Sequence, residues 1–326
     1  MVKAIRFHET GGPEVLRLEE IALPEPGPGQ ARVRHTALGV NFIDTYHRTG
    51  LYPLPLPSGL GVEAAGVVEE VGAGVTHVKP GDRVAYVSRP PGAYAEAAVV
   101  PADRLVLVPP GVPDEVAAAA MLKGMTVWML VRKIHAVQPG EAVLFHAAAG
   151  GVGLIAMQWL RALGARTLAT VGSDAKGELA RAAGASEVVV YTREDFVARV
   201  RALTGGAGVP VVYDSVGRST FQGSLDCLAP RGLLVSYGNA SGPVPPFEIA
   251  QLAAKGSLFL TRPTLFTYTA RREDLEEGAR ELFAVIASGQ VRIDVRHRWP
   301  LARASDAHRA LEGRETSGSI VLLPRG

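Results

Sequence analysis

A glycine-rich turn near the middle of the chain carries the clearest chemical signal in the sequence. An apolar segment, residues 142–147, runs into Ala148-Ala149-Gly150-Gly151-Val152-Gly153, and an apolar helical stretch follows. This is the dinucleotide-binding fingerprint with Ala148 in place of its first glycine. Gly150 lets the backbone approach a pyrophosphate, Gly153 lets the helix pack close to the strand, and the helix N-terminus offers free N–H groups to phosphates. No Gly-Lys-Ser or Gly-Lys-Thr follows, which excludes a P-loop.

The end of the next strand distinguishes between the two nicotinamide cofactors. NAD enzymes place Asp or Glu about 20 residues beyond the fingerprint, where it bonds the ribose 2′-hydroxyl. Here that place reads Val171-Gly172-Ser173, with Asp174 slightly later and Lys176 after it. Small residues leave room for a 2′-phosphate that Lys176 could neutralise, which favours NADPH. Two alternatives stay open: Asp174 could cap the next helix or bond a ribose, and Lys176 could be an ordinary solvated lysine.

Strands and helices alternate from the strand before this turn onward. The expected strands are residues 142–147, 167–171, 187–191, 209–214, 233–237 and 257–261, and the expected helices are 152–163, 175–183, 194–203, 219–228 and 247–254. Alternation of this kind implies a parallel sheet covered on both faces, the doubly wound arrangement. The sequence therefore predicts an α/β protein with a six-stranded Rossmann domain.

The first third of the chain has a different pattern, with short apolar runs separated by Gly and Pro turns. Strands are expected at residues 2–7, 15–21, 31–36, 64–71, 83–87 and 94–100. Asp114 then fits as the N-cap of a helix that runs towards Lys133. Near the end of the chain, a helix at 274–288 and the segment 291–323 no longer alternate. We expect them to fold back onto this β-rich domain.

The bulk composition excludes several classes of protein. A chain of 326 residues suggests two domains. With 34 basic and 32 acidic residues, the net charge of +2 gives no reason to expect a nucleic acid or an anionic membrane as partner. The charged N-terminus does not resemble a signal peptide, so a cytoplasmic location is expected. The single cysteine, Cys227, rules out an internal disulfide and a multi-cysteine metal site, and is read as a small buried hydrophobe.

Seven segments occur in an order that is typical of one known family. They are residues 7–16, 39–46, 59–66, 92–96, 146–153, 213–217 and 238–239. Together they resemble the quinone oxidoreductases of the medium-chain dehydrogenase/reductase superfamily, the zeta-crystallin group. The resemblance implies a GroES-like catalytic domain formed by residues 1–122 and 263–326, with a Rossmann NADPH-binding domain, residues 123–262, inserted between. It also implies an interdomain active site and a homodimer paired through the Rossmann sheets.

The same resemblance bears on the metal. Zinc-dependent relatives place Cys in the segment that matches residues 41–44 and His-Glu in the segment that matches 61–63. Here Asn41 and Val62 stand in those places, although Glu63 remains. A catalytic zinc needs three protein ligands and an open position, so we expect no zinc. Without a Lewis acid, quinones are suitable acceptors, because the reduced product is a delocalised anion that water can protonate. Orientation of the nicotinamide against the acceptor then does most of the catalysis.

Individual roles follow from the resemblance. The nicotinamide floor is expected from Asn41, Phe42, Asp44, Thr45 and Tyr46, with Asn41, Tyr46 and Tyr52 as candidate catalytic residues and Tyr46 and Tyr52 contacting the acceptor. Tyr52 could equally be a packing anchor. The expected cofactor-binding residues elsewhere are Thr126, Gly150, Gly151, Val152, Gly172, Ser173, Lys176, Tyr191, Gly238, Asn239, Ser241 and Arg314.

The function predicted from these observations is zinc-independent transfer of reducing equivalents from NADPH to a quinone. One rival is an NADPH-dependent alkenal, enone or acyl-thioester reductase on the same scaffold. A rival of a different class is an NADPH-binding sensor or an RNA-binding protein, which the near-neutral charge and the full set of cofactor motifs disfavour. No residue qualifies as a general acid.

Overall fold

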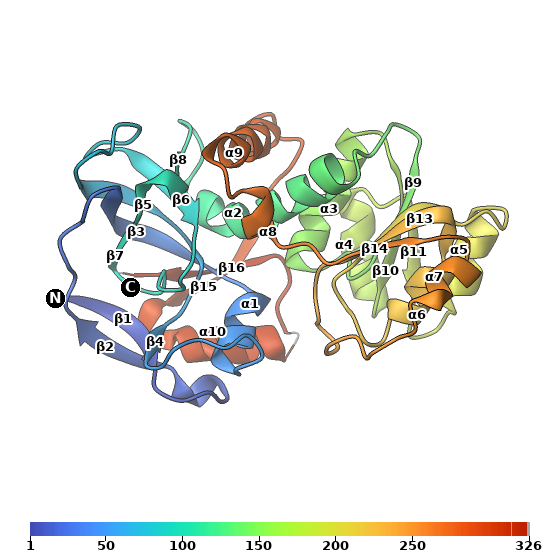
Figure 1. Cartoon of the computed structure of the whole chain (residues 1–326), viewed down its shortest axis with the longest axis horizontal. Helices are drawn as coiled ribbons and strands as arrows, with labels where there is room; N and C mark the ends of the chain where they lie inside the picture. The colour runs from blue at the N-terminus through green and yellow to red at the C-terminus, as the bar shows by residue number, and fades with distance from the viewer. Residues whose placement is uncertain (314, 325–326) are drawn as a thin grey trace. The chain divides into compact units, whose positions relative to one another are not determined.

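The computed structural model describes residues 1–313 and 315–324, which form two compact units. The first unit consists of Met1–Met125, Thr269–Ser288 and the chain from Ile293 onward. The second consists of Thr126–Tyr268 and Gly289–Arg292. Figure 1 follows the chain through both units from blue to red. No helix of the described chain is long and apolar enough to cross a membrane.

The first unit is built on antiparallel strands. A small sheet has the order β2 (Arg17–Ile21), β1 (Val2–Phe7), β4 (Ser58–Gly59). A larger sheet has the order β15 (Val295–Pro300), β16 (Ser319–Leu323), β3 (Gln30–Val40), β5 (Glu63–Val71), β6 (Arg83–Val87), β8 (Leu105–Leu107), and β7 (Ala97–Pro101) also pairs with β3. In β3, alternate residues are buried as far as Ala37, and every residue from Ala37 to Val40 is buried. The strand therefore enters the core of the unit just before the candidate site residues begin.

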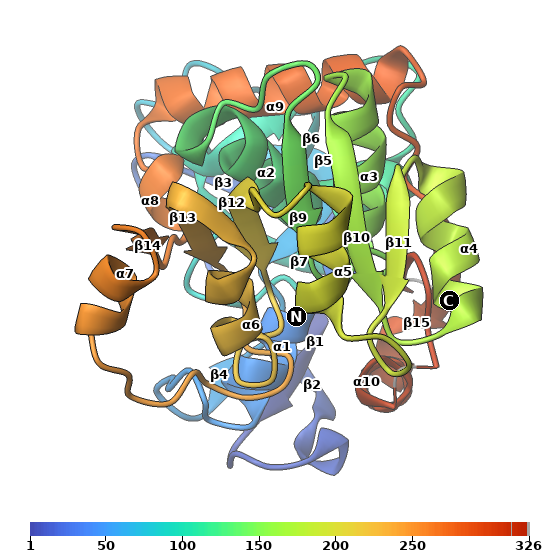
Figure 2. The ribbon, with the colours of Figure 1, turned by 90° about the vertical axis from the view of Figure 1, so that its right-hand side faces the viewer.

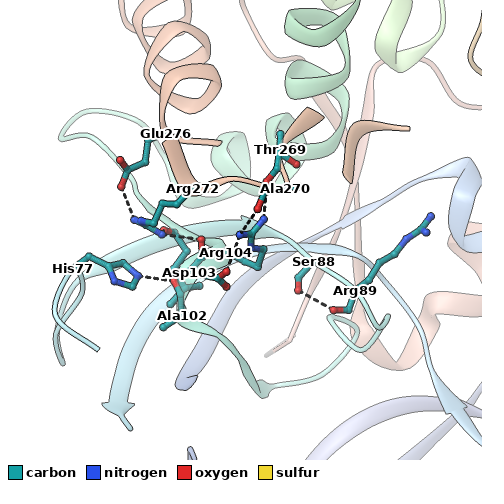
Figure 3. A network of polar contacts seen from close by, with 11 residues as sticks. His77, Ser88, Arg89, Ala102, Asp103, Arg104, Thr269, Ala270, Arg272 and Glu276 are labelled. Atoms are coloured by element: carbon teal, nitrogen blue, oxygen red, sulfur yellow. Dashed lines mark hydrogen bonds and ion pairs between the residues drawn. The ribbon is translucent and has the colours of Figure 1, made fainter. Parts of the chain in front are cut away.

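The C-terminal part of the chain completes this unit. Strand β16 pairs antiparallel with β3, so residues far apart in sequence share one sheet. Helix α9 (Arg272–Ala287) is attached near the 3₁₀ turn Ala102–Arg104, as Figure 3 shows. Arg104 donates to the carbonyls of Thr269 and Ala270 at 2.6 and 3.1 Å, and Arg272 donates to the carbonyl of Asp103 at 2.8 Å. These bonds fix the returning segment on the N-terminal strands.

The second unit contains a parallel sheet of six strands, as predicted. Its order is β11 (Glu187–Val190), β10 (Arg166–Val171), β9 (Ala142–Phe145), β12 (Val209–Asp214), β13 (Leu228–Ser236), β14 (Phe259–Thr261). Helices α3 (Gly151–Ala162) and α4 (Asp174–Ala183) cover one face, and α5 (Phe196–Leu203) and α6 (Phe221–Asp226) cover the other (Figures 1 and 2). The order of the strands reverses direction between β9 and β12, so the carboxyl ends of these two strands form the topological switch point.

Some elements differ from the expectation. The helix that begins at Asp114 is α-helical only to Trp128 (α2) and continues as a π-helix over Met129–Ile134. Asp114 is its first residue and not its cap, and the Asp114 carboxylate bonds Thr36 and Arg83. The remaining helices are α1 (Phe42–Arg48), α7 (Ala250–Ala254), α8 (Leu265–Tyr268) and α10 (Ala304–Glu312). Helix α1 was not predicted, and it carries most of the candidate site residues of the first unit.

Candidate functional site

The glycine-rich turn has the geometry that a pyrophosphate requires. Gly150 is the N-cap of α3, with extended backbone angles, and its N–H bonds the carbonyl of Ala147 at 2.9 Å. A Cβ on Gly153 would lie 2.4 Å from the carbonyl oxygen of Ala147, so only glycine fits there. Gly151 and Val152 open the helix, where backbone N–H groups have no helical partner and can bind phosphate oxygens. The turn therefore fits a dinucleotide.

The predicted adenosine-phosphate residues lie together at the ends of β10 and β11. Ser173 is the N-cap of α4, and its Oγ accepts from the backbone N of Lys176 at 3.4 Å. A Cβ on Gly172 would lie 2.8 Å from the hydroxyl of Tyr191, so this exposed tyrosine covers the glycine closely. Asp174 is not the cap of the helix; its carboxylate pairs with Arg193 at 2.5 Å on the surface. Gly172 and Ser173 thus form a small-residue edge, with Lys176 in the first turn of the helix that follows, which suits a 2′-phosphate.

A third cofactor loop follows β13. A Cβ on Gly238 would lie 2.4 Å from the carbonyl oxygen of Ser215, so the loop packs tightly against the one that follows β12. With its oxygen and nitrogen assigned so that both find partners, the Asn239 amide donates to the carbonyl of Gly238 at 2.9 Å and accepts from Arg262 at 3.2 Å. Ser241 donates twice to the carbonyl of Val216, from its N and from its Oγ, at 2.8 Å each. The predicted residues of this loop therefore lie at the carboxyl edge of the sheet, where ligands bind in such folds.

In the first unit, Asn41 and Glu63 form the centre of a buried polar cluster. Asn41 is the N-cap of α1, and its Nδ2 donates to Glu63 Oε1 at 2.7 Å. The fully buried Glu63 carboxylate also accepts from the backbone N of Leu122 at 2.6 Å and from Lys123 Nζ at 3.4 Å. Lys123 Nζ donates in addition to the carbonyl of Val40 at 3.3 Å. Because the carboxylate only accepts, it fixes the Asn41 amide with its NH₂ group towards Glu63.

Asp44 lies behind Asn41, on the first turn of the same helix. It is fully buried, and its Oδ2 accepts from the backbone N of Asn41 and from the Tyr94 hydroxyl at 2.9 Å each. Burial, with a smaller contribution from Glu63, raises the pKa of Asp44 to about 7. The Tyr94 hydroxyl also lies 3.2 Å from His308 Nε2, and Arg48 donates to His308 Nδ1 at 3.0 Å. Asp44 therefore holds the start of α1 in place from inside.

The two candidate tyrosines are in contact with each other. Tyr46 and Tyr52 pack edge to face with ring centroids 5.3 Å apart, and the N of Tyr52 donates to the carbonyl of Tyr46 at 3.0 Å. His47, which the sequence did not single out, packs against Tyr52 with a centroid distance of 6.0 Å. Burial and the charge of Arg89 lower the pKa of His47 to about 4, so it is a neutral ring at physiological pH. The helix that Asn41 caps and the segment just after it thus carry an aromatic cluster of Tyr46, His47 and Tyr52.

The predicted site residues divide between the units. Asn41, Phe42, Asp44, Thr45, Tyr46 and Tyr52 lie on or next to α1 in the first unit, where Phe42 is exposed and Thr45 bonds the carbonyl of Phe42. The second unit holds Thr126, on α2, and the residues of the three loops after β9, β10 and β13. Arg314 lies outside the described residues.

The residues around Glu63 do not fit a zinc ion. Asn41 and Val62 stand where zinc-dependent relatives have ligands, and Glu63 is already bonded by an amide, a backbone N–H and an ammonium group. Within the described part of the chain, three or more His, Cys, Asp or Glu side chains nowhere gather as metal ligands would. No step of the reaction is therefore assigned to a metal.

Comparison with known proteins agrees with this architecture. Residues 27–110 match the alcohol dehydrogenase GroES-like domain family, and residues 151–284 match the zinc-binding dehydrogenase family. The fold and the cofactor turn thus define a medium-chain dehydrogenase/reductase. A quinone oxidoreductase of Pseudomonas aeruginosa is 54% identical over 99% of this chain and 100% of its own length. The crystal structure of Escherichia coli quinone oxidoreductase complexed with NADPH is 51% identical, covers 99% of this chain and 100% of its own, and superposes with a TM-score of 0.97.

The chain belongs to the quinone oxidoreductase family. The expected family and fold class are thereby confirmed. A further relative, the 2-haloacrylate reductase of a Burkholderia species, is 47% identical over the whole of both chains. The matched family name "zinc-binding dehydrogenase" describes the wider group and does not describe the residues around Glu63 in this chain.

Proposed function

We propose that this protein is a zinc-independent NADPH:quinone oxidoreductase. The observation that carries the proposal is the environment of Glu63. Its carboxylate, in the region where zinc-dependent relatives hold their metal, is bonded by Asn41 and Lys123. A site of this kind lacks the Lewis acid that alcohol oxidation uses, and it suits an acceptor whose reduced form is a stable, delocalised anion. The similarity to quinone oxidoreductases over the full chain supports the same acceptor class.

The cofactor supplies the hydride, and the chain supplies binding and orientation. Backbone N–H groups at the start of α3 hold the pyrophosphate, and Ser173, Lys176 and Tyr191 hold the 2′-phosphate. Gly238, Asn239 and Ser241 support the cofactor from the loop after β13.

In the first unit, the amide of Asn41 and the pair Tyr46–Tyr52 contact the acceptor. Glu63 keeps the Asn41 amide in one orientation. The Asp44 carboxyl group accepts a hydrogen bond from the backbone N of Asn41 and so holds the first turn of α1 in place. Both carboxylates are fully buried, so they act by positioning. The two rings pack edge to face, and the face of one of them can stack against a quinone ring. Protonation of the reduced quinone is left to water.

The protein works as a cytoplasmic homodimer paired through its Rossmann sheets. Strand β14 is the last strand of the six-stranded sheet, and its Phe259 is 61% exposed. Ile249, just before α7, is 78% exposed. Large apolar side chains beside a sheet edge are typical of a surface that a second copy covers.

The experiment that tests the function is a panel of acceptors with NADPH and with NADH, followed by loss of reduced nicotinamide absorbance. We expect turnover with simple benzoquinones and a clear preference for NADPH. A 2-haloacrylate and an enal belong in the same panel. Faster turnover of either than of every quinone would instead assign the protein to the alkene reductases.

A further inference from the structure

A buried hydrogen-bonded chain lies beneath the cofactor turn of the second unit. His146 follows β9 directly, is fully buried, and has a partner on each ring nitrogen. Its Nδ1 lies 2.8 Å from Thr170 Oγ1, and its Nε2 lies 3.0 Å from Ser224 Oγ. Ser224 Oγ in turn lies 2.7 Å from Asp214 Oδ2. Segments containing His146 and Asp214 are typical of the family, but no role has so far been assigned to either residue.

The direction of each bond in this chain can be worked out. Asp214 accepts from the backbone N of Val216 at 2.8 Å, from that of Gly217 at 3.0 Å and from the Thr220 hydroxyl at 2.7 Å, so it acts as an acceptor throughout. The one hydrogen of Ser224 therefore points to Asp214. His146 Nε2 must then carry a hydrogen and donate it to Ser224, which leaves Nδ1 to accept from Thr170. Burial lowers the pKa of His146, in keeping with a neutral ring.

This series of hydrogen-bonded side chains connects the two loops that hold the middle of the cofactor, the glycine-rich turn after β9 and the loop at 238–241. Thr170 lies on β10, His146 at the end of β9 and Asp214 at the end of β12, which are three neighbouring strands. The residue after His146 is Ala147, whose φ of +53° starts the glycine-rich turn. At the other end, Asp214 holds the turn at Val216, to which Ser241 of the third cofactor loop is bonded. A shift in the chain would therefore move the two loops relative to each other.

We propose that Thr170, His146, Ser224 and Asp214 form a positioning network that sets the affinity for NADPH. The network holds His146 as the Nε2–H tautomer and fixes the spacing between the glycine-rich turn and the loop at 238–241. All four side chains are buried, so they act through these loops without touching the cofactor. The inference rests on the proposed use of NADPH.

The strand that contains Thr170 also provides a matched control. Thr167 lies three residues earlier on β10 and is equally buried, but within the described chain its Oγ1 has no hydrogen-bond partner. Thr170→Val and Thr167→Val thus make the same exchange of hydroxyl for methyl in the same strand. Only the first exchange removes the hydroxyl that donates to His146 Nδ1. Thr170→Ser keeps the hydroxyl and serves as the conservative rescue.

The experiment measures NADPH affinity by titration of the four proteins. We expect Thr170→Val to raise the dissociation constant about tenfold, in line with the loss of one buried hydrogen bond. Thr167→Val and Thr170→Ser should stay within about twofold of the wild type. The KM for the quinone should not change in any of them. If the wild type binds NADPH normally and Thr170→Val binds it as tightly as Thr167→Val, the proposed network is refuted and the proposed function is not. Failure of the wild type to bind NADPH overturns the proposed function.

A second measurement needs no variant. Nitrogen-15 NMR of histidine side chains distinguishes the two neutral tautomers. The wild-type protein should show His146 with hydrogen on Nε2 and none on Nδ1, with or without cofactor. Hydrogen on Nδ1 would contradict the direction of the chain, and it would do so even if Thr170→Val failed to fold.

Discussion

The two units satisfy their buried carboxylates in different ways. In the second unit, Asp214 receives two backbone N–H groups and two hydroxyls, all neutral donors that lie within ten residues of it. In the first unit, Glu63 receives Asn41, Leu122 and Lys123, which come from segments 22, 59 and 60 residues away. The second unit, which carries the predicted cofactor loops, is therefore organised around a local turn. The first unit, which carries the predicted acceptor residues, is organised around a buried ion pair whose partners are far apart in sequence.

This difference matters for function. A local turn whose donors are all neutral places no cation beside the buried carboxylate. A buried pair with distant partners fixes one arrangement of α1, but it is costly to disturb, because any lost partner leaves a charge in a dry environment. Mutations of these partners should therefore damage the first unit more than the second, and acid should act on the buried histidines of the first unit as well as on His146 of the second. The predictions below test this, from the largest expected effect to the smallest.

Acid should produce the largest effect, through three buried histidines of the first unit. Burial lowers the pKa of His35 to about 4, of His47 to about 4 and of His308 to about 3. Each is neutral when folded and gains a proton on unfolding below pH about 6.5. Stability is thus fully present above that pH and is lost as the pH falls towards 4, by about 1.4 kcal/mol for each unit of pKa separation. Denaturant unfolding at several pH values should show a loss of several kcal/mol.

The buried carboxyl of Asp44 changes the free energy of unfolding with pH in the opposite direction to the three histidines. Its folded pKa of about 7 lies above its ordinary value, so its contribution is present at low pH and is lost as the pH rises through about 7. Relative to the wild type, Asp44→Asn should therefore become more stable as the pH rises from 5 to 8. A constant difference across that range would contradict the burial of an ionisable carboxyl there.

The next largest loss of stability is expected for Lys123→Met, because this variant leaves the Glu63 carboxylate buried without its cation. Loss of one partner of a buried pair costs about 3–5 kcal/mol. The double variant Lys123→Met/Glu63→Gln should recover much of this loss, since a neutral amide needs no cation. The denaturant concentrations at the unfolding midpoints of the single and the double variant measure this recovery. If the single and double variants are equally unstable, the ion pair is not what the first unit depends on.

Substitutions at two glycines of the glycine-rich turn should affect the stability and the NADPH binding of the second unit to different extents. Gly153→Ala places a Cβ 2.4 Å from a backbone carbonyl oxygen, whereas at Gly150 the nearest atom is 3.2 Å away. Gly153→Ala should lower the free energy of unfolding by about 1–3 kcal/mol and abolish NADPH binding. Gly150→Ala should weaken NADPH binding with unfolding almost unchanged. Calorimetric titration and thermal unfolding of both variants check this.

The smallest effect on stability is expected at the sheet edge. Phe259→Lys should change the free energy of unfolding of one chain by no more than about 0.5 kcal/mol, because the side chain is 61% exposed. It should nevertheless shift the protein from dimer to monomer in sedimentation experiments. A wild-type protein that sediments as a monomer would exclude the proposed pairing.

The sequence predicted the second unit better than the first. Residues 209–214 and the other Rossmann strands alternate with helices at a regular spacing, so a local pattern was enough. Helix α1 was missed because it has only seven residues and follows β3 without a break of Gly or Pro. The bonds from Asp44 to Tyr94 and from Arg48 to His308 join residues 50 and 260 positions apart, which no local pattern reveals. The network of His146 could have been suspected, because polar residues lie at or next to the ends of three neighbouring strands.

The most direct test of the account is quinone-dependent oxidation of NADPH by protein treated with a strong chelator and dialysed free of metal. The environment of Glu63 predicts an unchanged rate after this treatment, and no recovery or gain when zinc is added back. A rate that falls with the chelator and returns with zinc would contradict the central claim that this site reduces quinones without a metal ion.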